Sequence, residues 1–370
     1  MRRFIGYFRT VLLIQIVCIS TAFAVPLEYK YPSYSYVFNE FDVDESYLYD
    51  DHFISFVSDH EKKLKLFYKH SLRRGQEILP MMQGLLVDDG VSDLFIYLSM
   101  VESGFSSDAI SPKKAVGLWQ FMPATAKHYN LTVCNSYDER CDTVSATSAA
   151  INYLNKLHKQ FGKWYLAALA YNCGEGRLSK AIKRAGTDDL SVLTDGNLKY
   201  LPRETRQYMK KILLVAMIGE NLSLGFSNDN NENFDNPLIQ VEVLAGTSLK
   251  EIAALLKMKE EKLLDLNRGL KNGVVPHDKA MHKITIPIEK MYAFYLRYEL
   301  PAVKKEYKSH MISHNVSLGE TLEDIAIYYE ADKEEIKTSN HLTDDFLTVG
   351  MLLVIPVTQN VFEKCLNNLN

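Results

Sequence analysis

Apolar residues recur at three- and four-residue spacing in several segments of the first 222 residues, which is the pattern of amphipathic helices. The clearest segment is 145–161, where one stripe consists of Ala150, Ile151, Leu154, Leu157, His158 and Phe161. Similar patterns predict helices over 164–171, 178–185 and 204–222. These segments are separated by Gly174, Gly176 and Gly186. We therefore expect this part of the chain to be mainly α-helical.

Two stretches lack any such period. Residues 26–51 are rich in Tyr, Asp and Glu and predict an extended, irregular lead-in to the helical part. Residues 227–236, SNDNNENFDN, contain no apolar residue except Phe234, which is typical of a linker. A change of domain is therefore predicted at this linker.

Beyond the linker the chain repeats itself. GTSLKEIAALLKMKEEKLLDLN, starting at Gly246, aligns without a gap with GETLEDIAIYYEADKEEIKTSN, starting at Gly319, and Asn267 coincides with Asn340. Each copy follows a strand-like apolar run and ends in another one that closes on Ile-Pro. In the second copy, Thr321 and a carboxylate three residues later form a capping-box pattern. Each copy therefore predicts a small strand–helix–helix–strand domain.

The first 24 residues predict a secretory signal. Arg2, Arg3 and Arg9 precede the apolar run 11–19, and Ala22-Phe23-Ala24 forms a cleavage pattern. The run is too short to span a bilayer, so a membrane anchor is the weaker interpretation. Cys18 follows Val17 rather than the small residue that lipid modification requires, and its lipidation stays open. We expect export across the inner membrane to the periplasm or cell envelope, with peripheral association and no transmembrane segment in the mature chain.

Charge and cysteine content argue against some classes of partner and ligand. The formal net charge is −4, loss of the signal arginines makes it more acidic, and no basic cluster is present, which argues against a nucleic-acid partner. No Cys or His spacing matches a zinc site, so neither a metal nor a cofactor is expected. Cys134 and Cys141 lie close together in a polar loop and are a candidate disulfide pair, although the four cysteines after the signal allow three pairings.

A candidate for chemistry is Glu102. The apolar run LFIYLSMV, residues 94–101, ends on Glu102 and Ser103 just before Gly104. Burying a carboxylate is costly unless it is paired or held with a raised pKa. Taken alone, the stretch favours the plainer interpretation, a glutamate at an exposed helix end.

Three further motifs follow in order: AVGLWQFMPATA (115–126), ALAYNCGEGR (168–177) and YLPRETRQYMKKIL (200–213). Singly each is weak, because GLWQF could be a packed turn and AYN the end of a buried helix. After the ES-x-F of residues 102–105, however, they resemble the four motifs of the lytic murein transglycosylases of the lysozyme-like superfamily, over roughly residues 78–222. With the two repeats, the arrangement resembles the membrane-bound members of that family that carry C-terminal LysM domains.

The resemblance implies roles for individual residues. Glu102 is implied as the catalytic acid and then base, Gln120 as a groove residue that hydrogen-bonds the sugar, and the Tyr171 hydroxyl as a hydrogen-bond partner of Glu102. Cys173 stands where the family motif usually has alanine. The implied substrate-binding residues are Ser103, Gln120, Met122, Tyr171, Asn172 and Tyr208.

The implied reaction cuts the bond between N-acetylmuramic acid and N-acetylglucosamine in peptidoglycan and leaves a 1,6-anhydro end without consuming water. A glutamate with a raised pKa at an apolar helix end suits this role, because it must protonate a poor leaving oxygen. Most glycosidases need a second carboxylate, and Asp108, the nearest one in sequence, is expected to be a loop or capping residue. Two alternatives remain: a hydrolase like goose-type lysozyme, and a non-catalytic wall-binding protein.

The repeats resemble LysM domains, whose implied ligand is the N-acetylglucosamine of peptidoglycan or chitin. The resemblance is strong for 314–356 and weaker for 239–287, where KNGVVPHDKAMHK inserts extra residues. For the first copy a purely structural role is the alternative. The implied glycan contacts are Gly319, Glu320, Thr321, Leu322, Leu347, Thr348 and Val349.

The fold class that follows is α+β and multidomain, with a mainly α-helical lysozyme-like catalytic domain followed by two small βααβ domains of LysM type. We expect a monomer. The expected order is a signal peptide (1–24), a lead-in (25–77), the catalytic domain (78–226), a linker (227–236), a degenerate LysM-like domain (237–289), a second linker (290–311), a LysM domain (312–358) and a C-terminal tail (359–370).

Overall fold

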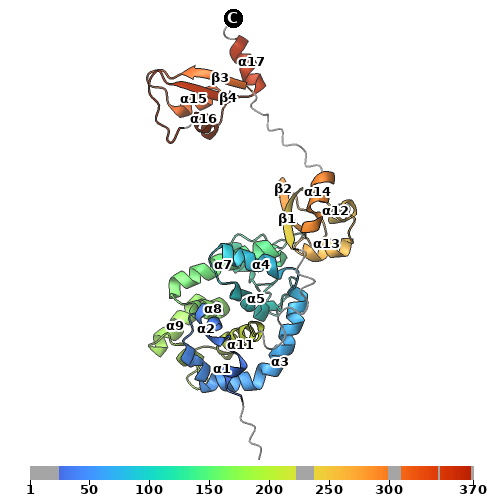
Figure 1. Ribbon diagram of the computed structural model, residues 1–370, viewed down its shortest axis with the longest axis vertical. Coiled ribbons are helices and arrows are strands. Elements are labelled where there is room, and N and C mark those ends of the chain that lie inside the picture. The colour runs from blue at the N-terminus through green and yellow to red at the C-terminus, as the bar shows by residue number, and fades with distance from the viewer. Residues whose placement is uncertain (1–24, 222–236, 299–309, 341, 368–370) are drawn as a thin grey trace, which may run out of the picture. The chain divides into compact units, whose positions relative to one another are not determined.

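The computed structural model of the protein describes residues 25–221, 237–298, 310–340 and 342–367 (Figure 1). The predicted signal peptide, Cys18 and the predicted linker 227–236 lie outside these residues. The chain forms two compact units, Met1–Phe294 and Tyr295–Asn370. Within the described ranges, no helix has the length and apolar character needed to cross a bilayer.

The expected irregular lead-in is wrong, because residues 26–51 are largely helical and packed. Tyr31, Phe38 and Phe41 are fully buried in the core of the helical domain. Their spacing gives these short helices an apolar side despite the polar composition, and the Asp50 carboxylate caps the next helix by accepting from the Phe53 N–H at 2.9 Å. The elements are α1 (Leu27–Lys30), α2 (Tyr34–Glu40) and η1 (Glu45–Tyr49).

The helical domain continues with eleven further elements in the described chain. They are α3 (Asp51–Gly75), α4 (Leu79–Asp88), η2 (Asp93–Phe95), α5 (Ile96–Ser103), α6 (Pro123–His128), η3 (Glu139–Cys141), α7 (Thr143–Phe161), α8 (Trp164–Cys173), α9 (Glu175–Ala185), α10 (Leu190–Thr194) and α11 (Arg203–Gly219). The helices predicted from periodicity are confirmed as α7, α8, α9 and α11. Of the three glycine breaks, Gly174 and Gly186 end α8 and α9, whereas Gly176 lies in the first turn of α9.

Helix α11 lies at the centre of this domain. It packs against α2, α3, α5 and α8, which surround it in Figure 1. Residues 212–218 of α11 are fully buried and apolar. A helix that is apolar on most sides belongs inside a domain, so α11 provides the core on which the other helices are placed.

Helix α5 is short, buried and ended by a required glycine. Residues 96–100 of α5 are buried, while Gly104 takes a left-handed conformation with φ 60° and donates to the Met100 carbonyl at 2.7 Å. A side chain at Gly104 would also lie 2.4 Å from the Arg74 guanidinium. The chain therefore has to stop α5 at this point, and it does so two residues after Glu102.

The first repeat has the predicted strand–helix–helix–strand order. It consists of β1 (Leu238–Leu244), α12 (Leu249–Leu255), α13 (Glu260–Leu266) and β2 (Met281–Pro287), followed by η5 (Ile288–Lys290) and α14 (Met291–Arg297). β1 pairs antiparallel with β2, from Leu238 opposite Pro287 to Leu244 opposite Met281. The range 290–311, expected to be a linker, thus begins with a helix, and its Phe294 is fully buried.

The second repeat has the same order. It consists of β3 (His310–Asn315), α15 (Leu322–Tyr328), α16 (Lys333–Ser339) and β4 (Leu352–Val357), and α17 (Gln359–Asn367) follows within the expected tail. β3 pairs antiparallel with β4. The predicted capping box is confirmed, because the Thr321 side chain accepts from the Asp324 N–H and the Asp324 carboxylate accepts from the Thr321 N–H.

The asparagine shared by the two repeats joins the second helix to the last strand. Asn267 accepts from the Thr285 N–H at 2.7 Å and donates to the Thr285 carbonyl at 2.8 Å. Asn340 does the same with Val354, at 2.7 Å for both bonds. Because an amide is both donor and acceptor, it satisfies both backbone groups of that strand residue, which gives the repeated asparagine a structural reason.

The first repeat packs on the helical domain through the segment that follows α13. The Asp138 N–H donates to the Gly269 carbonyl at 2.9 Å, and the Lys271 N–H donates to the Ser136 carbonyl at 3.1 Å. Ion pairs join Lys262 to Glu77 and Arg268 to Asp108. Asp108 is therefore an exposed loop residue, as expected, and it also contacts the first repeat.

The expected Cys134–Cys141 disulfide is wrong, because all four cysteines in the described ranges are free. Cys134 is exposed in a tight turn, in which its own N–H donates to the Tyr137 carbonyl at 2.8 Å. Cys141 is buried at the end of η3, and burial raises the pKa of its thiol to about 12. The two side chains occupy different environments even though they are close in sequence.

The packing of the lead-in predicts a large difference between two neighbouring aromatic residues. Phe38→Ala should lower the free energy of unfolding by about 3–5 kcal/mol, since it leaves a cavity in the core. The matched Tyr36→Ala should change it by less than about 1 kcal/mol, because Tyr36 is 48% exposed. Urea unfolding followed by circular dichroism measures both. Similar small effects for the two variants would mean that the lead-in does not pack on the core.

Candidate active site

The Glu102 carboxyl lies at the C-terminal end of α5, half-buried and closely surrounded by protein. Its partner is Tyr208 on α11, whose hydroxyl donates to Glu102 Oε1 at 2.6 Å. Burial raises the pKa of Glu102 to about 7, and the Tyr208 hydrogen bond acts in the opposite direction because it stabilises the ionised form. The carboxyl can therefore hold its proton near neutral pH, and the exposed-helix-end interpretation does not apply.

Two charges on α11 also act on Glu102. The negative charge of Glu204 raises the pKa of Glu102 and the positive charge of Lys211 lowers it. Glu204 precedes Tyr208 by four residues, so both side chains lie on one face of α11. The Glu204 side chain is 73% exposed and lies 3.7 Å from the Lys113 ammonium. Sequence reasoning missed this second carboxylate, although its spacing from Tyr208 was a usable signal.

The GLWQ loop is tied to α5 by two hydroxyls. Ser99 and Ser103 donate to the Leu118 carbonyl at 3.0 and 2.9 Å. Trp119 is fully buried and donates from its indole nitrogen to Thr147 Oγ1 of α7 at 3.0 Å. Ser103 therefore shapes the site by fixing the loop beside Glu102.

The expected hydrogen bond between Tyr171 and Glu102 is wrong. The Tyr171 hydroxyl donates instead to the Trp119 carbonyl at 2.7 Å, so it holds the GLWQ loop against α8. Glu102 still raises the pKa of Tyr171 through its charge, second to burial, which places the two groups in one electrostatic environment. The carboxyl and the loop thus use separate tyrosines, Tyr208 and Tyr171.

The buried Arg140–Asp138 ion pair also supports the GLWQ loop. Gly117 has φ 85°, and a side chain there would lie 1.7 Å from the Arg140 carbonyl oxygen, so only glycine fits. Arg140 pairs with Asp138 at 2.8 Å and donates to the carbonyls of Lys114 and Phe121, at 3.3 Å each. Although burial opposes it, the Arg140 hydrogen bond holds the pKa of Asp138 below its ordinary value. Arg140 and Asp138 therefore fix both ends of the loop, although neither residue belongs to a motif recognised in the sequence.

The remaining predicted groove residues differ in how free they are. The Gln120 side-chain nitrogen donates to the carbonyls of Ala109 and Gly117, at 3.2 and 2.9 Å, so this part of the amide holds the loop itself. Met122 is 43% exposed at the start of α6, and Asn172 is half-buried at the end of α8. Contact of these three residues with a sugar stays a prediction.

The predicted glycan contacts of the second repeat are only partly available. Leu322 is 1% exposed in the repeat's core, so its side chain is not available for the expected contact. Thr321 is exposed and caps α15, and its contact with a glycan stays a prediction. The Glu320 carboxylate accepts from the Ser317 N–H at 2.7 Å and lies 2.9 Å from His314 Nε2.

Apolar side chains nevertheless lie exposed in the two loops that contain the predicted glycan contacts, one after β3 and one before β4. Leu318, Phe346 and Val349 are 88%, 78% and 63% exposed. Sequence reasoning missed Leu318 and Phe346, although apolar residues in otherwise polar loops are a signal of binding. Gly319, Leu347 and Thr348 lie beside them in the same loops.

No metal centre is evident in the parts of the chain that the structure describes, since no three of their His, Cys, Asp and Glu side chains could hold an ion together. The Glu102 carboxyl, with its pKa raised to about 7, is suited to acid–base chemistry.

Three family models match the chain. Residues 88–193 match the transglycosylase SLT domain, residues 238–302 match the LysM-like domain of lytic transglycosylase MltD, and residues 314–356 match the LysM domain. These matches cover the Glu102 site, the first repeat and the second repeat, respectively. They also place the end of the first repeat beyond α14.

Known proteins with similar sequences include two transglycosylases. Membrane-bound lytic murein transglycosylase D of Escherichia coli K12 is 30% identical over 271 residues, which are 70% of this chain and 59% of that protein. A peptidoglycan transglycosylase of Escherichia phage T7 is 37% identical over 131 residues, 35% of this chain and 9% of that protein. Among solved structures, the 70 kDa soluble lytic transglycosylase of Escherichia coli is 21% identical over 38% of this chain and 24% of its own, with a TM-score of 0.33.

The matched part of the chain thus spans less than two thirds of the length of the first of these relatives. The domain assignments agree with the geometry, because the SLT match contains Glu102 and the GLWQ loop, and both repeats have the βααβ order. The chain therefore belongs to the proteins that combine a transglycosylase SLT domain with C-terminal LysM-type domains.

Proposed function

We propose that the protein is a lytic transglycosylase that cleaves the β-1,4 bond between N-acetylmuramic acid and N-acetylglucosamine in peptidoglycan. The observation that carries the proposal is the Glu102 carboxyl, whose pKa is raised to about 7 by burial and which accepts a hydrogen bond from Tyr208 inside an SLT domain. The names of the two similar transglycosylases support the same reaction and substrate.

In the first step, protonated Glu102 donates its proton to the glycosidic oxygen. The bond between that oxygen and C1 of N-acetylmuramic acid breaks, N-acetylglucosamine leaves, and the 2-acetamido group of the substrate stabilises the positive charge at C1. Glu102 becomes a carboxylate, and the Tyr208 hydroxyl then stabilises it through a charge-assisted hydrogen bond. The same tyrosine thus favours proton donation in the direction of cleavage.

In the second step, the Glu102 carboxylate accepts the proton of the muramyl 6-hydroxyl. The 6-oxygen bonds to C1 and closes the 1,6-anhydro ring, and Glu102 regains the proton that it had donated. No water is consumed and no second carboxylate is required. The fixed GLWQ loop, held by Ser103, Tyr171 and Arg140, forms the wall against which the sugar is positioned.

A hydrolase like goose-type lysozyme is the competing function, and Glu204 is the observation that favours it. Glu204 supplies a second carboxylate on the Tyr208 face of α11, where it could activate water as inverting glycosidases do. Its exposure and its pairing with Lys113 weaken this role, because a solvated carboxylate is a poor base for a water held at one point. The products distinguish the two reactions.

We place the protein in the cell envelope, because its substrate is there and the N-terminal residues carry a secretory pattern. One of the similar transglycosylases is described as membrane-bound. Peripheral association through the glycan fits this location.

The two repeats are proposed to have different roles. In the first repeat, the segment before β2, which corresponds to one loop of predicted glycan contacts in the second repeat, is paired with Ser136 and Asp138 of the helical domain. That repeat is therefore a structural part of the catalytic unit. The second repeat exposes Leu318, Phe346 and Val349 in its two candidate glycan loops and is proposed as the wall-binding domain. A weak binding domain on the same chain raises the local concentration of the enzyme at its substrate.

The proposed function is tested by mass spectrometry of the fragments released from purified peptidoglycan. Wild type should release fragments one water lighter than those of a lysozyme, Glu102→Gln should release none above background, and the matched Glu204→Gln should retain activity within about tenfold. Fragments of ordinary hydrolytic mass, lost in Glu204→Gln, would establish the hydrolase instead. Absence of fragments with every protein would favour the non-catalytic binding protein.

The wall-binding role of the second repeat is tested by deletion of residues 309–370. Binding to intact sacculi should weaken by roughly tenfold or more, whereas cleavage of short soluble glycans should stay within about twofold of wild type. Phe346→Ser should reproduce part of the binding loss without removing the domain, and the exposed Tyr292→Ser should not. Equal losses of sacculus binding and soluble-glycan cleavage would contradict the role.

A further inference from the structure

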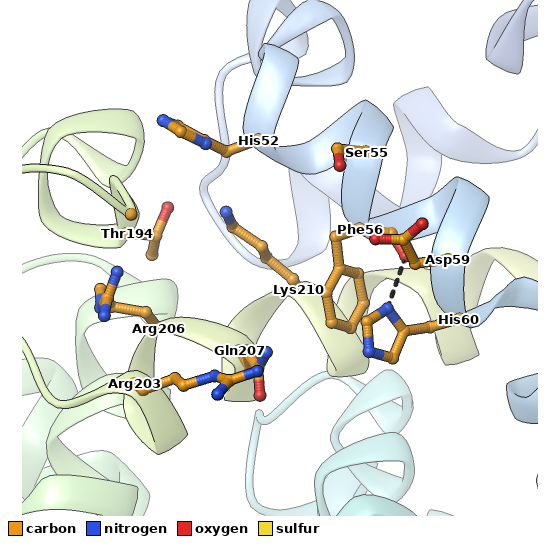
Figure 2. A pocket seen from close by; sticks show the side chains of 11 residues that line it. His52, Ser55, Phe56, Asp59, His60, Thr194, Arg203, Arg206, Gln207 and Lys210 are labelled. Carbon is orange, nitrogen blue, oxygen red and sulfur yellow. Dashed lines mark hydrogen bonds between the residues drawn. The ribbon is translucent and has the colours of Figure 1, made fainter.

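A cavity in the helical domain lies between α3 and α11. Its volume is about 370 Å³, within the range of small-molecule sites. Arg203, Arg206 and Lys210 of α11 line one side, and His52 and His60 of α3 line the other (Figure 2). We call it the α3–α11 cavity.

This cavity is separate from the Glu102 site. Residues 203, 206 and 210 share one face of α11, whereas Glu204, Tyr208 and Lys211, which act on Glu102, lie about a third to a half of a turn away. No residue that lines the cavity has a role in the proposed reaction. Its chemistry therefore needs its own explanation.

Lys210 is the central feature of the cavity. It is only 6% exposed, and it lines the cavity. Figure 2 shows its side chain reaching towards His52 and Thr194. Burial lowers the pKa of Lys210, while the charges of Asp50 and Asp195 act in the opposite direction. The Lys210 ammonium is therefore a cation held in place by its buried stem and open to a ligand in the cavity.

Arg206 leaves a second donor unused beside it. Its Nη1 donates to the Asp195 carbonyl at 3.0 Å, which holds the guanidinium in place. Its Nε is fully buried and has no partner among the described atoms. The cationic groups of Lys210 and Arg206 therefore line one cavity, and Arg206 carries an unpartnered donor.

The nearby acids do not neutralise these cations. Asp195 accepts from the Leu198 N–H at 2.9 Å and lies 3.4 Å from His52 Nε2, and Asp50 accepts from the Phe53 N–H as a helix cap. The acid in the cavity lining is Asp59, which is exposed. The cavity thus keeps an excess of positive charge together with the unpartnered Arg206 Nε, a combination suited to an anion with several acceptor oxygens.

We propose that the α3–α11 cavity binds a small oxyanion, a phosphate or carboxylate group carried by an organic molecule, between Lys210 and Arg206. The oxygens accept hydrogen bonds from the Lys210 ammonium and the Arg206 guanidinium, and the rest of the ligand occupies the remaining volume towards α3. The site is distinct from the groove at Glu102 and does not depend on the proposed reaction.

The test is a titration with inorganic phosphate, followed by calorimetry on the full mature chain. Lys210→Met and Arg206→Gln should each weaken phosphate binding about tenfold or more, as expected for the loss of a charge-assisted hydrogen bond. The control Lys180→Met, an exposed lysine on α9, should bind as wild type does. The proposal is overturned if all three variants bind phosphate equally, or if wild type binds neither phosphate nor the carboxylate probe described next.

The source of the oxyanion is distinguished by a second probe, a disaccharide that carries a peptide stem, compared with the same disaccharide without it. Competition with phosphate by the stem-bearing form alone, lost in Lys210→Met, would identify a substrate carboxylate. Phosphate binding without competition would identify a separate phosphorylated ligand. Thermal melting separates a binding defect from a folding defect. Phosphate should raise the melting temperature of wild type and not that of Lys210→Met, and a cooperative melting transition of Lys210→Met would show that this variant is folded.

Discussion

The structure depends on one unfavourable placement, a carboxyl group taken out of water at the end of a buried helix. Glu102 would be ionised in solvent, and burial raises its pKa to about 7. Three features of the fold bury the carboxyl. Helix α5 is apolar on nearly all sides, Gly104 ends it two residues after Glu102, and α11 packs against it through the centre of the domain. Tyr208 supplies the hydrogen bond that keeps the ionised form accessible, so the carboxyl can both give and take a proton.

Asp138 connects the residues that support the GLWQ loop to the first repeat. The Asp138 carboxylate holds Arg140 and thereby the GLWQ loop, while the Asp138 backbone N–H binds the Gly269 carbonyl of the first repeat. Lys271 of that repeat lies 3.5 Å from the same carboxylate. The first repeat is thus built onto the support of the loop, which agrees with the structural role proposed for it.

The sequence was informative wherever a local pattern had one structural solution. The stripe of α7, the helix end at Gly104 and the capping box at Thr321 could be predicted, because spacing and residue chemistry decide them locally. The lead-in was mispredicted because its buried aromatic residues are outnumbered by polar neighbours and acquire their partners only from distant helices. The roles of Tyr171 and Tyr208 were assigned from motifs. Which of the two tyrosines contacts Glu102 depends on the path of the GLWQ loop, which is far from both of them in sequence. The absent disulfide has the same cause, since proximity in sequence says nothing about which side of a turn each thiol faces.

The most direct measurement is a carbon-13 NMR titration of the Glu102 carboxyl, assigned by its absence in Glu102→Gln. A folded pKa near 7 is predicted, so the group stays protonated well above the pH at which an ordinary glutamate ionises, at about 4.3. Tyr208→Phe should raise the pKa further, because the lost hydrogen bond favours the carboxylate, whereas Tyr171→Phe should change it less, because that hydroxyl is bonded to Trp119. A Glu102 pKa near the ordinary value in the wild-type protein would contradict the account, since the group could then not act as an acid at neutral pH.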